Sequence, residues 1–95
     1  MKLSIKAPSH AEEKALIRST EKVMRQFFKN HSSAQEADVR FLFGPDRSGK
    51  KICEVYLKMK DRNIFVTQQA DSFESSATKA LEKLHYQVEN VINSR

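Results

Sequence analysis

Five basic side chains recur along the first half of the sequence at the spacing of one face of an α-helix. The residues that share this spacing are Lys14, Arg18, Lys22, Arg25 and Lys29. At ~100° per residue they fall within an arc of roughly 80°, over a length of roughly 22 Å. Such a row of cations can neutralise successive phosphates of a nucleic acid, because each contact releases a condensed counterion. The chemistry that this pattern predicts is binding to a polyanion.

A solvated helix surface that is basic by chance is the alternative interpretation of the same pattern. Like charges four residues apart, as at Lys14 and Arg18, destabilise a helix by roughly a few tenths of a kcal/mol per pair, and folding gains nothing from them. The acids Glu12, Glu13 and Glu21 lie outside the basic arc. The whole chain carries a formal net charge of +5, which favours polyanionic partners.

A second, weaker candidate surface lies in the last third of the chain. Lys79, Lys83, Tyr86 and Asn90 share the outer face of a predicted helix, opposite its apolar row. Lys83 could hold a phosphate, and Tyr86 could stack on a base or a ribose. Ordinary surface lysines and a half-exposed tyrosine would give the same spacing, so this surface adds modest support to the first.

One segment matches the phosphate-binding loop pattern G-x-x-x-x-G-K, from Gly44 to Gly49 and Lys50. It fails as a nucleotide site for two reasons. Lys51 stands where Ser or Thr should bind magnesium, and the sequence that follows is typical of a strand, whereas a nucleotide site needs a helix N-terminus there.

The histidines and the cysteine do not form a site either. His10, His31 and His85 have no partner at the spacing of metal ligands. Cys53 lies on the apolar face of a predicted strand, which favours a buried and unreactive thiol. No pair of titratable groups is placed to act as acid and base. The sequence therefore predicts no metal, no cofactor, no small-molecule substrate and no enzymatic activity.

The elements that position these residues follow from hydrophobic periodicity, first in the N-terminal half. Residues 2–6 alternate as a short strand. Ser9 and Glu12 form a capping box, so a helix is expected to begin near Ser9, and it should end near Asn30. Its predicted apolar face consists of Leu16, Ile17, Thr20, Val23, Met24, Phe27 and Phe28.

Three more strands and a second helix follow. Residues 39–43 and 51–59 show the two-residue period of strands, and residues 64–67 are predicted to form a further strand. The turns between these segments predict an antiparallel meander. Asp71 or Ser72 caps the second helix, which is expected to run to the end of the chain. Its predicted apolar row consists of Phe73, Ala77, Ala80, Leu81, Leu84, Val88 and Val91.

The predicted order of elements is β-α-β-β-β-α. Two amphipathic helices and a sheet with one apolar face pack most economically with both helices on that face. We therefore expect an α+β fold, a two-layer sandwich with a four-stranded sheet. A chain of 95 residues supports one hydrophobic core, so residues 1–95 are expected to form a single domain. No signal sequence or membrane-spanning run is present in the sequence, which predicts a cytoplasmic protein.

The segment from Ile64 to Glu89 resembles the family of ribosome hibernation-promoting factors and ribosome-associated inhibitors, also called sigma-54 modulation proteins. Members typically have an acidic cap and an aromatic residue at the start of the last helix, followed by a K-L-x-x-Q-[LV] segment. The matching segments here are Asp71-Ser72-Phe73 and Lys83-Leu84-His85-Tyr86-Gln87-Val88. The spacing to Lys83 fits best if Ser72 replaces the acidic cap, and Tyr86 stands where many members carry Arg.

The resemblance implies a stress-response factor that binds between the head and body of the small ribosomal subunit, where mRNA and tRNA would lie, and blocks translation in idle ribosomes. Carried over to this chain, the basic face of the first helix becomes the candidate contact to ribosomal RNA, together with Lys79 and Lys83. Tyr86 is the added candidate for stacking. The chain is expected to be the short form, without the C-terminal dimerisation domain of longer members, and to be monomeric off the ribosome.

Two alternatives use the same basic face. A general double-stranded-RNA-binding domain shares the α-β-β-β-α order, but it expects a basic start to its last helix. Asp71 and Glu74 give this start the opposite sign. A regulatory protein-interaction module could bind an acidic partner in the same way.

Overall fold

The computed structural model describes residues 2–8, 13–45 and 48–93, with side chains in the last helix described up to Glu89. The elements in chain order are β1 (Lys2–Lys6), α1 (Glu13–Asn30), β2 (Ala34–Phe43), β3 (Lys51–Met59), β4 (Asn63–Ala70) and α2 (Phe73–Asn93). The predicted order β-α-β-β-β-α is confirmed. The capping box predicted at Ser9 and Glu12 lies outside the described residues, as do His10 and the side chains of Asn90 and Val91.

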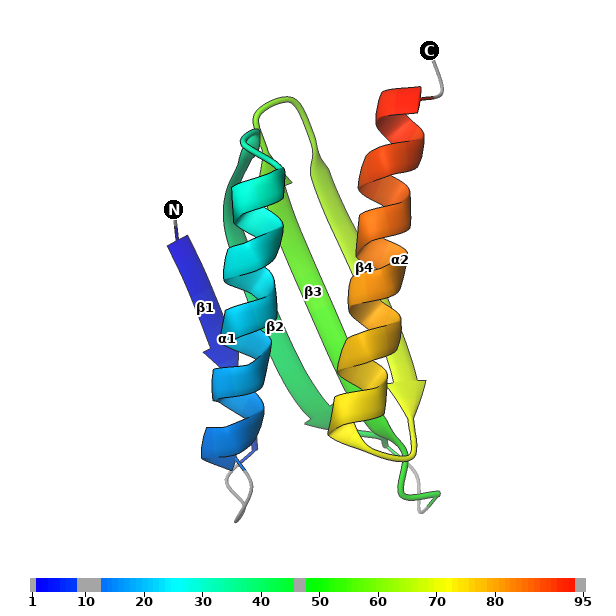
Figure 1. The fold of residues 1–95 in the computed structure, drawn as a ribbon. Helices are drawn as coiled ribbons and strands as arrows, with labels where there is room; N and C mark the ends of the chain where they lie inside the picture. Colours follow the sequence, from blue (N-terminus) through cyan, green and yellow to red (C-terminus); the bar gives the residue numbers. More distant parts are fainter. Residues whose placement is uncertain (1, 9–12, 46–47, 94–95) are drawn as a thin grey trace.

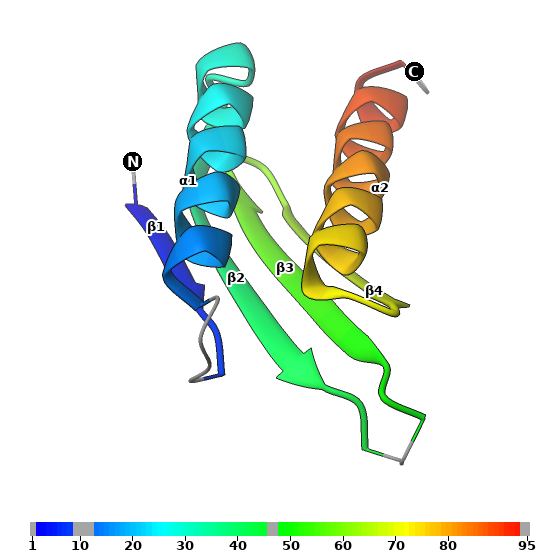
Figure 2. The ribbon, with the colours of Figure 1, turned by 60° about the horizontal axis from the view of Figure 1, so that its bottom comes forward.

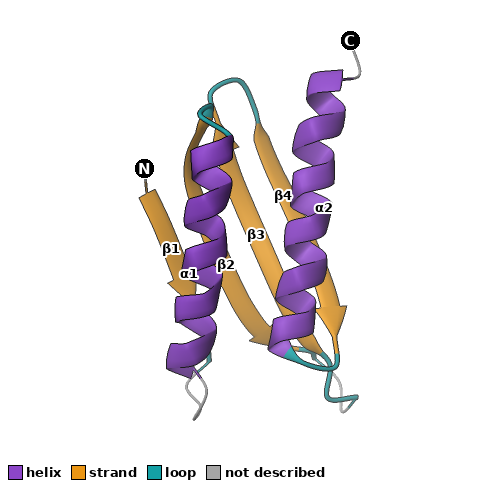
Figure 3. Ribbon diagram, viewed as in Figure 1, coloured by secondary structure: helices purple, strands orange, loops and turns teal. Residues whose placement is uncertain are grey.

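The four strands form one mixed sheet in the order β1-β2-β3-β4. β1 runs parallel to β2, and a parallel pair needs a crossover connection, which α1 supplies. β2, β3 and β4 are antiparallel neighbours, so the predicted meander is confirmed. Both helices lie on the same face of the sheet and run in the same direction (Figure 1 and Figure 3). The protein is the α+β two-layer sandwich that the sequence predicts.

Two strands are longer than the apolar alternation indicates. β2 begins at Ala34, whereas the prediction placed it near Val39, and β4 continues to Ala70, whereas its predicted end was near Thr67. The added part of β2 consists of Ala, Gln, Glu and Asp, most of which are depleted in strands. Pairing along the central strand β3 holds both extensions in the sheet. Sheet context therefore outweighs local propensity at these two ends.

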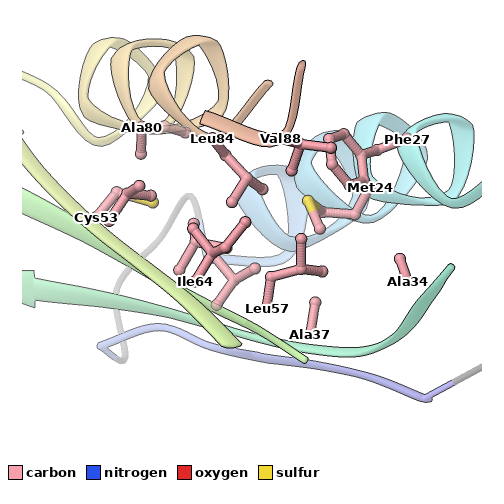
Figure 4. Close-up of a cluster of buried hydrophobic side chains, with 14 of the residues drawn as sticks. Met24, Phe27, Ala34, Ala37, Cys53, Leu57, Ile64, Ala80, Leu84 and Val88 are labelled. Carbon is pink, nitrogen blue, oxygen red and sulfur yellow. The ribbon is translucent and has the colours of Figure 1, made fainter. Parts of the chain in front are cut away.

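The hydrophobic core lies between the helices and the sheet. Met24 and Phe27 of α1 and Leu84 and Val88 of α2 point toward the strands, where Leu57 occupies the middle of the sheet (Figure 4). All five are buried. This layer fixes the faces of both helices, because it leaves only their opposite sides for contact with partners.

Cys53 belongs to the same core, and the prediction that its thiol is buried is confirmed. Its side chain is fully buried. Burial, together with the nearby charge of Glu54, raises the pKa of the thiol to about 12. The thiolate, which is the nucleophilic form, is therefore scarce at neutral pH.

Val23 departs from the predicted apolar face of α1. Its side chain is 49% exposed, although the 3.6-residue period places it among core residues. Leu81 of α2 is only partly buried as well. The physical reason is that the two helices lie apart above the sheet, so that the flanks which face each other are left open to solvent.

Ser72 caps α2, which resolves the choice between Asp71 and Ser72. Its hydroxyl oxygen accepts a hydrogen bond from the backbone N–H of Ser75 at 3.1 Å, and the helix begins at the next residue, Phe73. Asp71 is engaged elsewhere, because its carboxylate pairs with the Lys50 ammonium group at 2.8 Å. The hydrogen bond and charge of Lys50 lower the pKa of Asp71.

We expect Ser72→Ala to lower the free energy of unfolding by about 0.5–2 kcal/mol, because the Ser75 N–H loses its acceptor. Urea denaturation followed by circular dichroism measures the change. Ser75→Ala is the matched control, since it removes an exposed hydroxyl and keeps the capped N–H. Equal losses in the two variants would show that Ser72 does not act as the cap.

Candidate nucleic-acid interface

The α1 stripe consists of Lys14, Arg18, Lys22, Arg25 and Lys29, and all five side chains are exposed. The opposite side of α1 is held against the sheet by buried residues that include Leu16, Met24 and Phe28. The stripe therefore faces solvent along the whole helix, as the sequence predicts. Apart from Arg25, the residues of the stripe form no ion pair and no side-chain hydrogen bond within the described part of the chain.

Arg25 forms the one intramolecular contact recorded for the stripe in the described residues. Its guanidinium donates to the Glu21 carboxylate at 3.0 Å, one helical turn earlier. Both side chains are largely exposed, and such surface pairs contribute roughly 0–1 kcal/mol. Because the interaction energy of this pair is small, a phosphate could replace the Glu21 carboxylate as the acceptor for Arg25.

The second candidate set, Lys79, Lys83 and Tyr86, lies on the flank of α2 that faces away from α1. All three side chains are exposed, and Tyr86 is 56% exposed. Together with Gln68 of β4 they line an open depression of about 460 Å³. β4 is the edge strand farthest from β1. The depression therefore lies on one side of α2, and α1 lies on the opposite side of α2 (Figure 2). Glu82 lies in the same depression, so this surface is of mixed charge.

The structure does not bring the two sets together. The α1 stripe reaches the space between the helices only at Lys22, whereas Lys79 and Lys83 border the far side of α2. One extended RNA strand that follows the stripe would have to cross α2 to meet the second set. The geometry therefore makes the α1 stripe the primary candidate and the α2 set a separate, weaker one.

An open groove between α1 and α2 is the feature that sequence reasoning missed. Its volume is about 450 Å³. The residues that line it are Lys22, Val23, Gln26, Phe27, Asn30, His31, Leu81 and His85. The sequence places Val23 and Leu81 in the apolar rows of the two helices, but it contains no signal for a groove between them.

Two histidines that the sequence leaves far apart meet at one end of this groove. The rings of His31 and His85 have centroids 5.5 Å apart, and His31 also stacks on Phe27 at 4.4 Å. His31 Nε2 is buried without a hydrogen-bond partner, while His85 lies 3.1 Å from the Glu89 carboxylate. Burial, and then the nearby charge of His85, lower the pKa of His31, and Glu89 opposes this in part.

The lowered pKa of His31 predicts a loss of stability at mildly acidic pH. The unfolded chain binds this proton more readily than the folded one, so the stabilising effect is complete above the ordinary pKa of 6.5 and is lost as pH falls below it. We expect the Tm to fall between pH 7.5 and pH 5.5, where exposed carboxylates stay ionised. Thermal melts of His31→Gln should show a smaller drop over this interval. An equal drop would contradict the assignment.

The face of the sheet opposite the helices carries a pair of exposed aromatic residues. Tyr56 of β3 and Phe65 of β4 are direct cross-strand partners, and they are 41% and 55% exposed. Asp38, Arg40 and Glu54 surround them, so the charge of this face is mixed. Phe65 lies between Ile64 and Val66 in a run of apolar residues, so no alternation in the sequence predicts that its side chain points outward.

The loop from Gly44 to Lys50 is a hairpin closed by a backbone hydrogen bond between these two residues at 2.8 Å, and the strand β3 follows it. The described residues contain no cluster of His, Cys, Asp or Glu that could hold a metal ion. Neither α1 nor α2, as far as the structure describes them, has the length and apolar character needed to cross a membrane.

The fold belongs to a class of small α+β domains with a parallel β1–β2 pair and two helices on one face. A ribosomal subunit interface protein from Coxiella burnetii has this fold, with a TM-score of 0.84 and 17% identity over 98% of this chain and 99% of that one. The N-terminal domain of Protein Y from Thermus thermophilus is similar as well, with a TM-score of 0.77 and 14% identity over 96% and 99% of the two chains.

At these identities the likeness establishes the fold, and it agrees with the fold that the hibernation-factor resemblance implies. No protein-family model matches the chain, and no curated protein matches it in sequence.

Proposed function

We propose that this protein is a ribosome-associated translation inhibitor that binds ribosomal RNA of the small subunit through the α1 stripe. The observation that carries the proposal is the row of exposed, mostly unpaired cations along α1. It occurs on the fold of a protein named for the ribosomal subunit interface. The resemblance of the last helix to hibernation factors supports the same partner.

The proposed mechanism is steric occlusion. A domain whose longest dimension is 42 Å would occupy the channel between head and body of the small subunit, where mRNA and tRNA anticodon arms lie in an active ribosome. Residues 1–95 would act as a single ribosome-binding domain in the cytoplasm of stressed cells, and the protein would be monomeric off the ribosome. Binding alone suffices, so the proposal includes no catalytic step and no cofactor.

The α2 set has a supporting role in this proposal. Because Lys79, Lys83 and Tyr86 face away from the stripe, they would contact a different segment of ribosomal RNA. Two lysines beside an acidic residue neutralise fewer phosphates than the five cations of the stripe. Tyr86 can add stacking on an exposed base or ribose.

Cosedimentation with purified small subunits across a salt series tests the proposal. We expect the protein to pellet with the subunits at low and moderate salt. The logarithm of the affinity should fall steeply and linearly with the logarithm of salt concentration, since every neutralised phosphate adds to the slope. Failure to pellet at moderate salt would refute the proposal. Stable binding to a protein target under those conditions would favour a protein-interaction module, and equal affinity for any RNA duplex would favour a general double-stranded-RNA-binding domain.

A further inference from the structure

The groove between α1 and α2 has apolar walls that remain in contact with solvent. Val23 projects from α1 and Leu81 from α2, and Phe27 lies at the base. Val23 is 49% exposed, although Leu16, Met24 and Phe28 of the same helix are buried. A planar group that entered between Val23 and Leu81 would remove both side chains from water, which is the main driving force for ligand binding in open pockets.

Polar groups with both donor and acceptor capacity line the same groove. The amides of Gln26 and Asn30 lie on the α1 side, and the imidazoles of His31 and His85 lie at one end. Neutral amides and imidazoles match the mixed donor and acceptor pattern on the edges of nucleobases.

The charge at the groove favours a ligand that carries negative charge. The described residues that line it include Lys22 and no carboxylate. Lys22 is also a member of the α1 stripe. If Lys22 bound a phosphate of an RNA strand, the nucleotide that carries this phosphate would lie at the edge of the groove. An apolar slot beside a row of phosphate-binding cations is the arrangement with which proteins bind unpaired nucleotides.

We propose that this groove binds a single unpaired nucleobase of the RNA whose phosphates lie along the α1 stripe. The inference rests on the proposed function and extends it, because it states that the target segment is single-stranded or bulged. Bases of a continuous duplex are stacked and paired, and they cannot enter the groove. In this proposal the stripe provides affinity for any RNA. The groove provides selectivity for an RNA that has an unpaired base able to leave the stack.

Fluorescence anisotropy with two labelled RNAs tests this inference on the intact chain. One RNA is a short single-stranded oligouridylate, and the other has the same length and phosphates but abasic ribose at its central positions. We expect the complete RNA to bind about tenfold more tightly, since stacking of one base on a protein surface typically gives this factor or more. The imidazole proton signals of His31 and His85 should shift with the complete RNA alone.

A matched pair of variants locates the effect. Val23→Gln removes the apolar wall of the groove and is expected to abolish the preference for the complete RNA. Phe65→Gln replaces an apolar residue of similar exposure, 55% against 49% for Val23, on the opposite side of the sheet. It should retain the tenfold preference. Neither side chain belongs to the core, so both variants should stay folded. Thermal melts of the two variants check this.

Each alternative outcome decides the question. Equal affinity for the two RNAs, together with salt-dependent cosedimentation on small subunits, would refute the base pocket and leave the proposed function intact. Weaker ribosome binding by Val23→Gln in the absence of any base preference would also refute it, and would indicate that the groove holds a protein side chain instead. If the protein neither binds RNA nor pellets with ribosomes, the proposed function itself is wrong.

Discussion

Simultaneous charge reversal at Arg18 and Arg25, as Arg18→Glu with Arg25→Glu, is expected to weaken binding to small ribosomal subunits about a hundredfold or more. Hydrogen bonds to charged groups contribute roughly 1.5–3 kcal/mol each. At about 1.4 kcal/mol per tenfold change, the loss of two phosphate contacts alone gives about a hundredfold. Repulsion between the new carboxylates and RNA adds to it. Cosedimentation at one fixed, moderate salt concentration measures the effect.

The fold should tolerate this change. Both arginines are exposed, and the one recorded contact that is lost among the described residues is the surface pair between Arg25 and Glu21. A glutamate at position 18 would lie one turn from both Lys14 and Lys22, which stabilises a helix slightly. The far-ultraviolet circular dichroism spectrum and the Tm of the double variant should therefore stay close to those of the unchanged protein.

A matched control separates position from net charge. Lys58→Glu with Lys60→Glu changes the formal charge by the same amount, but Lys58 lies on the face of the sheet opposite the helices and Lys60 in the turn after β3. This variant should bind small subunits far better than the stripe variant does. If the two variants lost affinity equally, binding would depend on overall charge, and the stripe would not be the interface. Retention of binding by the stripe variant would exclude the stripe as well.

Periodicity was sufficient to predict the order of the elements and most of the buried faces of α1, α2 and β3. The stripe on α1 and the apolar face of β3, from Cys53 to Met59, follow directly from spacings of 3.6 and 2 residues. The resulting fold needed one further physical argument, namely that two amphipathic helices and a one-sided sheet share a single core. All of this information is local in sequence.

Relations between distant elements could not be predicted in this way. The period assigned Val23 to the core because it cannot reveal how far apart α1 and α2 lie above the sheet. The meeting of His31 with His85, and the groove that they close, depend on the same distance. The separation of Lys22 from Lys83 on opposite flanks is equally non-local. Helix-to-helix spacing is set by packing against the sheet, which no single segment encodes.

The difference between the predicted and the actual burial of a side chain determines how much its truncation lowers the free energy of unfolding. Leu84 and Val23 both belong to the apolar rows predicted for their helices, yet Leu84 is 0% exposed and Val23 is 49% exposed. Leu84 points from α2 into the layer between helices and sheet (Figure 4). Leu84→Ala removes buried methyl groups and leaves a cavity, at a cost of about 2–5 kcal/mol.

Against a total stability of about 5–15 kcal/mol for a small domain, Leu84→Ala should lower the Tm by about 10 °C or more. Val23→Ala should change the free energy of unfolding by no more than about 0.5 kcal/mol, because its side chain already contacts water. Urea denaturation of the two variants measures both values. Equal destabilisation would mean that the groove between α1 and α2 is closed in solution, and then neither the exposed wall at Val23 nor a base pocket beside Lys22 would exist.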